Sequence, residues 1–241
     1  MYDFESRVRF SETDRNRVLT MESIVDYFQD CSTFQSEDLG VGIDHLTDRD
    51  LVWVLNYWQI VAEEYPRLGD RIRVGTFPYE FKGFMGLRNF LMLNDQGKRI
   101  VGANSLWTLL NRKTMQPVRV PEDILSRYQL EEKLDMDYEP RKIKVTGEGI
   151  EEKPIRVEKH HLDCNEHVNN GQYIRIAAAY LARELSVHQL RAEYRRQAHL
   201  GDWIYPVRYQ SGERTAIVLW SNEKEPYAII EFWQKEGKRE C

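Results

Sequence analysis

Alternating hydrophobic and polar positions recur in two blocks along the chain, and a segment with helical periodicity precedes each block. The alternating segments of the first block are "LVWVLNYWQIVAEEY", "RIRVGTFPYEF", "GLRNFLMLND" and "RIVGANSLWTLLN". Those of the second block are "LSVHQLRAEYRR", "DWIYPVRYQ", "TAIVLWSN" and "PYAIIEFWQK". We expect helices over about 20–38 and 168–185, each after a short strand, around 4–10 and 153–160. The pattern predicts an α+β fold in which a long helix is wrapped by an antiparallel sheet, twice in tandem.

An internal repeat supports this organisation. Aligning Asp14 with Asp163 also places Asn16 on Asn165. A second landmark, Glu-Tyr followed by Leu-Gly-Asp, occurs in "EEYPRLGDRIRV" and in "AEYRRQAHLGDWIYPV". The alternative is that common turn and cap residues align by chance. We interpret the chain as a duplication with an N-terminal copy, a linker and a C-terminal copy, over residues 1–116, 117–150 and 151–241.

Composition narrows the class of protein. The 241 residues are 41% hydrophobic and have a net charge of −5, which makes non-specific binding to nucleic acid a poor explanation. Three cysteines without CxxC spacing indicate a reducing compartment and no zinc ribbon. No apolar run approaches the length of a membrane span, and the N-terminus lacks the basic and apolar regions of a signal peptide. We therefore expect a globular cytoplasmic protein that does not enter a membrane.

The stretch "HLDCNEHVNN", residues 161–170, holds the candidate site just before the second expected helix. Asp163, Asn165 and His167 alternate within it. Asp163 or Asn165 could simply cap the helix, and both copies have the same Asp-x-Asn. Capping does not explain His167, whose counterpart in the first copy is Val18. This asymmetry predicts one working site, in the second copy.

These residue types suit attack on a thioester or an ester. Unpaired N–H groups at a helix N-terminus stabilise a developing oxyanion, and an asparagine adds a donor. A histidine transfers protons near neutral pH, and a carboxylate can orient it or act as base or nucleophile. A metal site is the rival chemistry, because His160 and His161 lie nearby, but the spacing matches no compact metal-binding motif. We expect no metal.

The segments "HLDCNEHVNNGQYI" and "AEYRRQAHLGD", with the tandem layout, resemble the acyl-acyl carrier protein (acyl-ACP) thioesterases, the plastid enzymes of plants and their bacterial relatives. The resemblance runs over essentially the whole chain. It implies a tandem double hot-dog fold, hydrolysis of fatty acyl-ACP thioesters in fatty acid biosynthesis, and catalytic roles for Asp163, Asn165 and His167. It also implies that the acyl chain lies largely in the N-terminal copy, that acyl carrier protein is the partner, and that no cofactor is needed.

One segment departs from the plant pattern. Plant members usually read "EYRREC" where this chain reads "EYRRQA", so Gln197 and Ala198 stand in place of a glutamate assigned to the attacking water and a cysteine once proposed as nucleophile. Ala198 excludes a cysteine mechanism at that position, and Gln197 can hold a water but cannot take its proton. The base is then Asp163 or His167. We expect Cys164 to pack inertly, turned away from Asp163.

The most apolar expected strand, "LVWVLNYWQIV", is either core or the wall of an acyl-binding tunnel. Strict alternation along it would place Trp53, Leu55 and Tyr57 on one face, with Gln59, and we take the first three as substrate-binding candidates. Two groups of basic residues are candidates for docking an acidic carrier protein, or are merely solvated charges. They are Arg195 with Arg196, and Arg141 with Lys142 and Lys144.

Two other functions remain open at this point. One is an acyl-CoA thioesterase, and the other is a double hot-dog that binds acyl groups as a sensor without hydrolysing them. The sequence also leaves open the length and saturation of the acyl chain, and whether the protein is a monomer or a homodimer.

Overall fold

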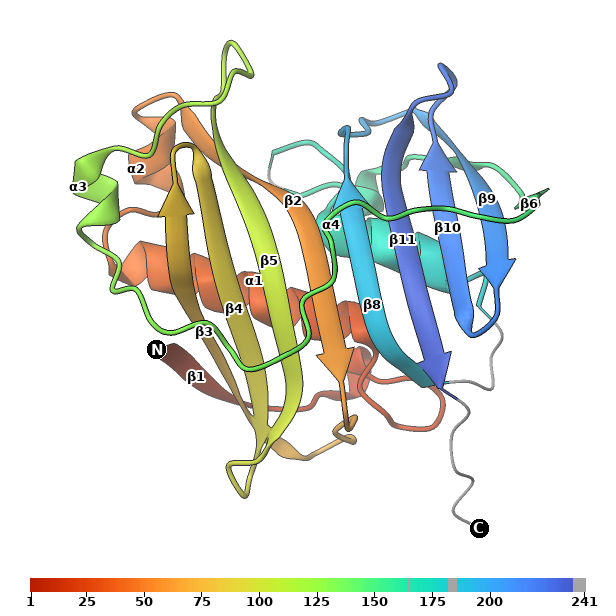
Figure 1. The fold of residues 1–241 in the computed structure, drawn as a ribbon, viewed down its shortest axis with the longest axis horizontal. Coiled ribbons are helices and arrows are strands. Elements are labelled where there is room, and N and C mark those ends of the chain that lie inside the picture. Colours follow the sequence, from red (N-terminus) through yellow and green to blue (C-terminus); the bar gives the residue numbers. More distant parts are fainter. Residues whose placement is uncertain (164, 182–185, 236–241) are drawn as a thin grey trace. The chain divides into compact units, whose positions relative to one another are not determined.

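The chain divides into two compact units, Met1–Tyr138 and Glu139–Cys241 (Figure 1). The computed structural model describes residues 1–163, 165–181 and 186–235. In each unit the longest helix packs on an antiparallel sheet, so the α+β prediction is confirmed. The segment 117–150, which we assigned to a linker, contributes to both units. Of the helices in the described residues, none combines the length and the apolarity that crossing a membrane requires.

The sheet of the first unit has the strand order β1-β3-β4-β5-β2, and all neighbours are antiparallel. Helix α1 lies across one face of this sheet (Figure 1). The strands are β1 (Tyr2–Arg7), β2 (Leu51–Ala62), β3 (Arg71–Lys82), β4 (Met85–Asn94) and β5 (Arg99–Asn111). The helices are η1 (Phe10–Glu12), α1 (Met21–Asp38), α2 (Ile43–Thr47) and α3 (Glu122–Leu125).

Helix α1 is defined by its cap and its apolar stripe. The side chain of Thr20 accepts a hydrogen bond from Ser23 N, which satisfies one of the free N–H groups of the first turn. Phe28 is fully buried on the face toward the sheet, where its ring lies 6.1 Å from Trp58 and 5.2 Å from Phe90, centroid to centroid. Burial of these aromatic side chains holds the helix on the sheet.

A β-bulge in β2 changes which of its side chains face α1. Leu55 pairs with Trp107 and Tyr57 pairs with Leu106, so Asn56 is an extra residue with no partner on β5. The alternation therefore shifts by one after Asn56. Trp53 and Leu55 share the helix side of the sheet with Trp58, while Tyr57 and Gln59 face the opposite side. Our prediction that Trp53, Leu55 and Tyr57 share one face was wrong, because a bulge leaves no clear sign in the hydrophobic pattern.

The second unit repeats the arrangement on a smaller scale. Its sheet has the order β8-β11-β10-β9-β6, with β7 also paired to β9, and helix α4 packs on β10 and β11. Its strands are β6 (Gly149–Glu151), β7 (Ile155–Arg156), β8 (Ser186–Tyr194), β9 (Trp203–Ser211), β10 (Arg214–Trp220) and β11 (Pro226–Lys235). Its helices are η2 (Lys159–His161) and α4 (Asn170–Ala178).

Helix α4 is shorter than the expected 168–185. It begins after Asn169, whose side-chain Oδ1 accepts from Gly171 N at 2.8 Å. After Ala178 the chain tightens, because Tyr180 N and Leu181 N donate to carbonyls three residues back instead of four. Residues 182–185 lie outside the described residues.

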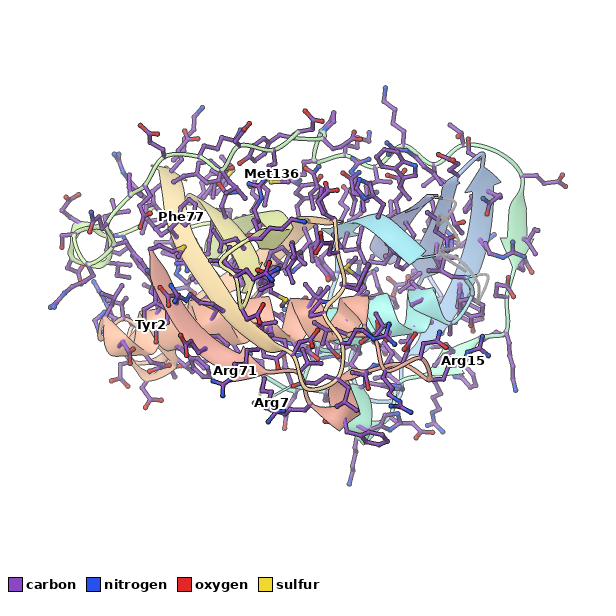
Figure 2. All side chains as sticks on the ribbon, turned by 90° about the horizontal axis from the view of Figure 1, so that it is seen from below. Tyr2, Arg7, Arg15, Arg71, Phe77 and Met136 are labelled. Atoms are coloured by element: carbon purple, nitrogen blue, oxygen red, sulfur yellow. The ribbon has the colours of Figure 1, made fainter. Side chains whose placement is uncertain are left out.

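The segment 117–150, which we call the connecting segment, covers the face of each sheet that points away from the helix. In the first unit, Gln59 Nε2 donates to Asp137 O at 2.8 Å and Asn89 Oδ1 accepts from Leu134 N at 3.0 Å. Figure 2 shows this part of the connecting segment, where Met136 is labelled, on the opposite side of the sheet from α1. In the second unit, Arg191 Nη2 donates to Pro140 O at 2.5 Å, and Arg191 also pairs with Glu231 at 2.9 Å. Buried, charge-assisted hydrogen bonds of this kind fix the covering chain in place.

Candidate active site

A five-residue loop, 163–167, is built around the carboxylate of Asp163. Asp163 Oδ1 accepts from Asn165 N at 2.8 Å and from His167 N at 3.4 Å, and Asp163 N donates to His167 O at 2.8 Å. Glu166 takes a positive φ of 62° at the tip of the loop. The carboxylate thus holds the loop, and Asn169 caps the helix. The alternative that Asp163 or Asn165 caps α4 does not hold, because Asn169 is the cap. The same kind of acceptor serves a loop or a helix end equally well.

The first unit contains the same loop. Asp14 Oδ1 accepts from Asn16 N at 2.8 Å and from Val18 N at 2.9 Å, and Asp14 N donates to Val18 O at 2.9 Å. Arg17 takes φ 62° at the position of Glu166. Thr20 caps α1 at the position where Asn169 caps α4. The two copies therefore share these three hydrogen bonds and the positive φ, and they differ in the side chain at the last position of the loop, Val18 in one and His167 in the other.

His167 is half-buried, and its environment favours the neutral imidazole. Burial is the main cause that lowers the pKa of His167 below its ordinary value, and the neighbouring His199 adds to the effect. Asp163 and Glu166 act in the opposite direction. Because the net pKa is lowered, His167 is unprotonated at neutral pH and can accept a proton.

His199 is a candidate that the sequence analysis missed. The rings of His167 and His199 lie edge to face with centroids 4.7 Å apart, and the two residues form an isolated antiparallel bridge. His199 precedes the Leu-Gly-Asp turn, in which its N–H donates to Asp202 Oδ2 at 2.9 Å. The alignment of the second landmark places His199 on Arg67, whose N–H donates to Asp70 Oδ2 at 2.7 Å. This alignment was the one sign in the sequence that could have pointed to His199.

The segment around Gln197 lies against the loop and the start of α4. Ala198 is fully buried, its N–H donates to Tyr173 Oη at 2.9 Å, and its carbonyl accepts from Val168 N at 3.0 Å. Gln197 is half-buried. Gln197 directly precedes Ala198 in the chain, and Asn165 is exposed. Cys164 lies outside the described residues.

The remaining candidates lie elsewhere. Trp53, Leu55 and Tyr57 belong to β2 of the first unit. His161 Nδ1 accepts from Glu158 N at 2.9 Å and thereby holds the start of η2. Within the residues that the structure describes, no group of three or more histidine, cysteine, aspartate or glutamate side chains could hold a metal ion.

The two groups of basic residues differ in their pairing. Arg196 Nη1 lies 2.8 Å from Glu223 and 2.5 Å from Glu225, and Arg195 Nε lies 3.1 Å from Glu193. These pairs largely neutralise the first group. Arg141, Lys142 and Lys144 are exposed.

Comparison with known proteins places these features in one family. Residues 1–128 match the family model described as the acyl-ACP thioesterase N-terminal domain, and residues 143–235 match the C-terminal domain of the same family. The chloroplastic acyl-(acyl-carrier-protein) hydrolase FATB1 of Cuphea viscosissima is 28% identical over 212 residues, which are 79% of this chain and 49% of that protein. The oleoyl-acyl carrier protein thioesterase 1 of Arabidopsis thaliana is 26% identical over 81% of this chain and 60% of its own length. The chain spans about half the length of the curated relatives it matches.

Two solved structures share the fold across both units. An acyl-ACP thioesterase from Bacteroides thetaiotaomicron superposes with a TM-score of 0.89 at 23% identity, covering 97% of each chain. The 12:0-ACP thioesterase from Umbellularia californica superposes with a TM-score of 0.83 at 18% identity, covering 98% of each chain. At this identity the likeness shows the fold, and it confirms the expected tandem double hot-dog.

Proposed function

The chain belongs to the acyl-ACP thioesterase family, and we propose that it hydrolyses the thioester between a fatty acyl chain and acyl carrier protein. The products are the free fatty acid and the thiol of the carrier's phosphopantetheine arm. The observation that supports this function best is the half-buried His167, held in its neutral form on a carboxylate-centred loop whose twin in the first unit has valine instead.

The reaction needs a base for water and a site for the oxyanion. In this proposal the water oxygen attacks the thioester carbon while His167 accepts a proton from that water. Asp163 binds the loop through Oδ1, and we assign its other oxygen to orienting His167 or the water. The exposed amide of Asn165 is our candidate donor to the oxyanion. The carbon–sulfur bond then breaks, and the leaving thiolate takes the proton from His167.

Gln197 completes the proposed site as a water-positioning residue. It can donate to and accept from a water but has no titratable proton. For the acyl chain, we keep Trp53 and Leu55 on the helix side of β2 as candidate contacts. Tyr57 lies on the other face, which the connecting segment covers, so its role in binding the chain would require that cover to move.

The proposal also names acyl carrier protein, rather than CoA, as the carrier of the acyl chain. Acyl carrier proteins are acidic, and complementary charge speeds and orients docking. Arg141, Lys142 and Lys144 are the exposed basic group on the second unit, the unit that contains His167. Their charge suits docking of an acidic carrier protein.

The test of the function is to measure thiol release from one acyl chain presented on acyl carrier protein and on CoA. We expect kcat/KM to be higher for the carrier-protein substrate, and more so at low salt because docking is electrostatic. Equal or faster release from CoA would reassign the carrier. The absence of thiol release from either substrate, over a series of chain lengths and with a folded protein, would favour an acyl-binding sensor.

Asn165→Ala tests the oxyanion assignment, with Asn16→Ala as the matched control. Asn165 contributes its backbone N–H to the loop, so loss of the side chain should leave the loop intact. We expect kcat to fall by about 10²- to 10³-fold, as for loss of one oxyanion donor. Asn16→Ala should leave kcat nearly unchanged. Steady-state kinetics with thermal unfolding of both variants would check this, and equal loss in the two variants would contradict the assignment.

A further inference from the structure

His199 lies beside the residue to which the proposed function assigns proton transfer. The imidazole centroids of His167 and His199 are 4.7 Å apart with an interplanar angle of 67°. His199 is exposed, whereas His167 is half-buried. Edge-to-face packing of this kind is a favoured geometry that restrains both rings. The proposed mechanism gives His199 no role.

The backbone fixes His199 independently of its side chain. His199 N donates to Asp202 Oδ2 at 2.9 Å, and Asp202 N donates back to His199 O at 3.1 Å. Gly201, between them, has φ 88°, which favours glycine. Next to His199, the carbonyl of Ala198 accepts from Val168 N at 3.0 Å. These contacts hold position 199 opposite His167 whatever side chain it has, so substitutions there are compatible with the fold.

The first unit provides a reference for this pair. Val18 and Arg67 form the same isolated bridge as His167 and His199, and the backbone of Arg67 is held by Asp70 in the same way. Arg67 Nη2 donates to the carbonyl of Asn16 at 3.1 Å, so it binds the loop backbone. The copy without an imidazole on the loop also lacks one on the turn. The two histidines therefore occur together, and only in the second copy.

Two charged groups on the loop of His167 and one on the facing turn affect its protonation. Asp163 and Glu166 on its own loop favour the imidazolium, while His199 on the facing turn disfavours it. Tyr173 of α4 binds the backbone of Ala198, and burial raises the pKa of its phenol, so it stays neutral. Burial lowers the pKa of His167 most, and His199 is the group that adds to this lowering. Two imidazolium cations in contact repel each other.

We propose that His199 is a positioning residue for the hydrolysis: its ring orients the imidazole of His167 by edge contact, and its charge repels a proton on that imidazole. The inference rests on the proposed function, because it takes His167 as the base. It assigns to the Leu-Gly-Asp turn of the second unit a part in setting the pH range over which the site works.

The kinetic test compares His199→Gln and His199→Lys across pH, with acyl-ACP as substrate. The base must be unprotonated, so the acid limb of kcat/KM follows the pKa of His167 in the free protein. His199→Gln removes the repelling group, and the acid limb should move to higher pH. His199→Lys installs a lasting positive charge, and the limb should move to lower pH. A purely structural role would not move the limb in opposite directions. Arg67→Gln, the matched change in the first unit, should leave the limb in place.

A second measurement does not depend on turnover. The ring Cε1 proton of His167 can be followed by NMR through a pH titration and identified by its loss in His167→Ala. In His199→Gln, the pKa of His167 should be higher than in the unchanged protein. If both His199 variants are folded and keep the original acid limb and the original His167 titration, the inference is wrong and the proposed function stands. If His167→Ala hydrolyses acyl-ACP at the original rate, the proposed base is wrong, and the NMR titration still decides whether His199 acts on His167.

Discussion

Replacing His167 with valine, the residue that the first copy has at this position, is expected to lower kcat by about 10²- to 10⁴-fold, because general-base catalysis typically contributes that much. The substitution should fold, since Val18 ends a loop with the same hydrogen bonds in the first unit. Steady-state hydrolysis of acyl-ACP would measure the loss, and an equilibrium binding assay with the same substrate would show whether binding survives.

Val18→Ala is the matched control for this prediction. It shortens the side chain at the corresponding place and leaves the second unit untouched, so we expect kcat to stay close to that of the unchanged protein. If Val18→Ala lowered kcat as far as His167→Val, the assignment of the chemistry to the second unit would fail.

Asp163→Ala and Asp14→Ala should cost similar stability but differ sharply in rate. Each carboxylate accepts two backbone N–H groups of its loop. Hydrogen bonds to a charged group are worth about 1.5–3 kcal/mol when buried, and these loops are partly exposed, so we expect each variant to lose about 1–2 kcal/mol of unfolding free energy. Only Asp163→Ala should also lower kcat, by at least about 10²-fold, because it releases the loop that presents His167.

Chemical denaturation and kinetics on the same two preparations would check this pair of variants. The stability change should fall in the unit that contains the substitution. A fall in kcat of similar size in Asp14→Ala would mean that the first loop takes part in the chemistry, contrary to the proposal.

The fold was predictable because its signals are local. The alternation of strands such as β10 and the apolar stripe of α1 follow directly from residue spacing, and the repeated Asp-x-Asn identified the duplication. The helix cap was misassigned because several side chains near a helix start can accept a backbone N–H. Asn169, which has no match to Asp14 or Asn16, turned out to be the one that does so in α4.

The sequence predicted only part of the candidate site. Asp163, Asn165 and His167 are near neighbours in the chain, so their grouping needed no tertiary information. His199 reaches His167 only because the Leu-Gly-Asp turn folds back against the loop. The alignment of the two copies marks position 199 but does not show this contact. The face of β2 was misjudged for a related reason, because Asn56 adds one residue to the strand and shifts all later side chains.

The connecting segment has a consequence for engineering the chain. Its first part is tied to Gln59 and Asn89, and its later part to Arg191 and to Glu193, whose Oε2 accepts from Ile143 N. A shorter or more flexible connecting segment would remove hydrogen-bonding partners from both sheets. It should therefore not be replaced by a glycine-serine linker of the kind often used between fused domains. A tag or reporter is better inserted beyond these ties, at the exposed turn around Gly147, where the positive φ already marks a bend of the backbone.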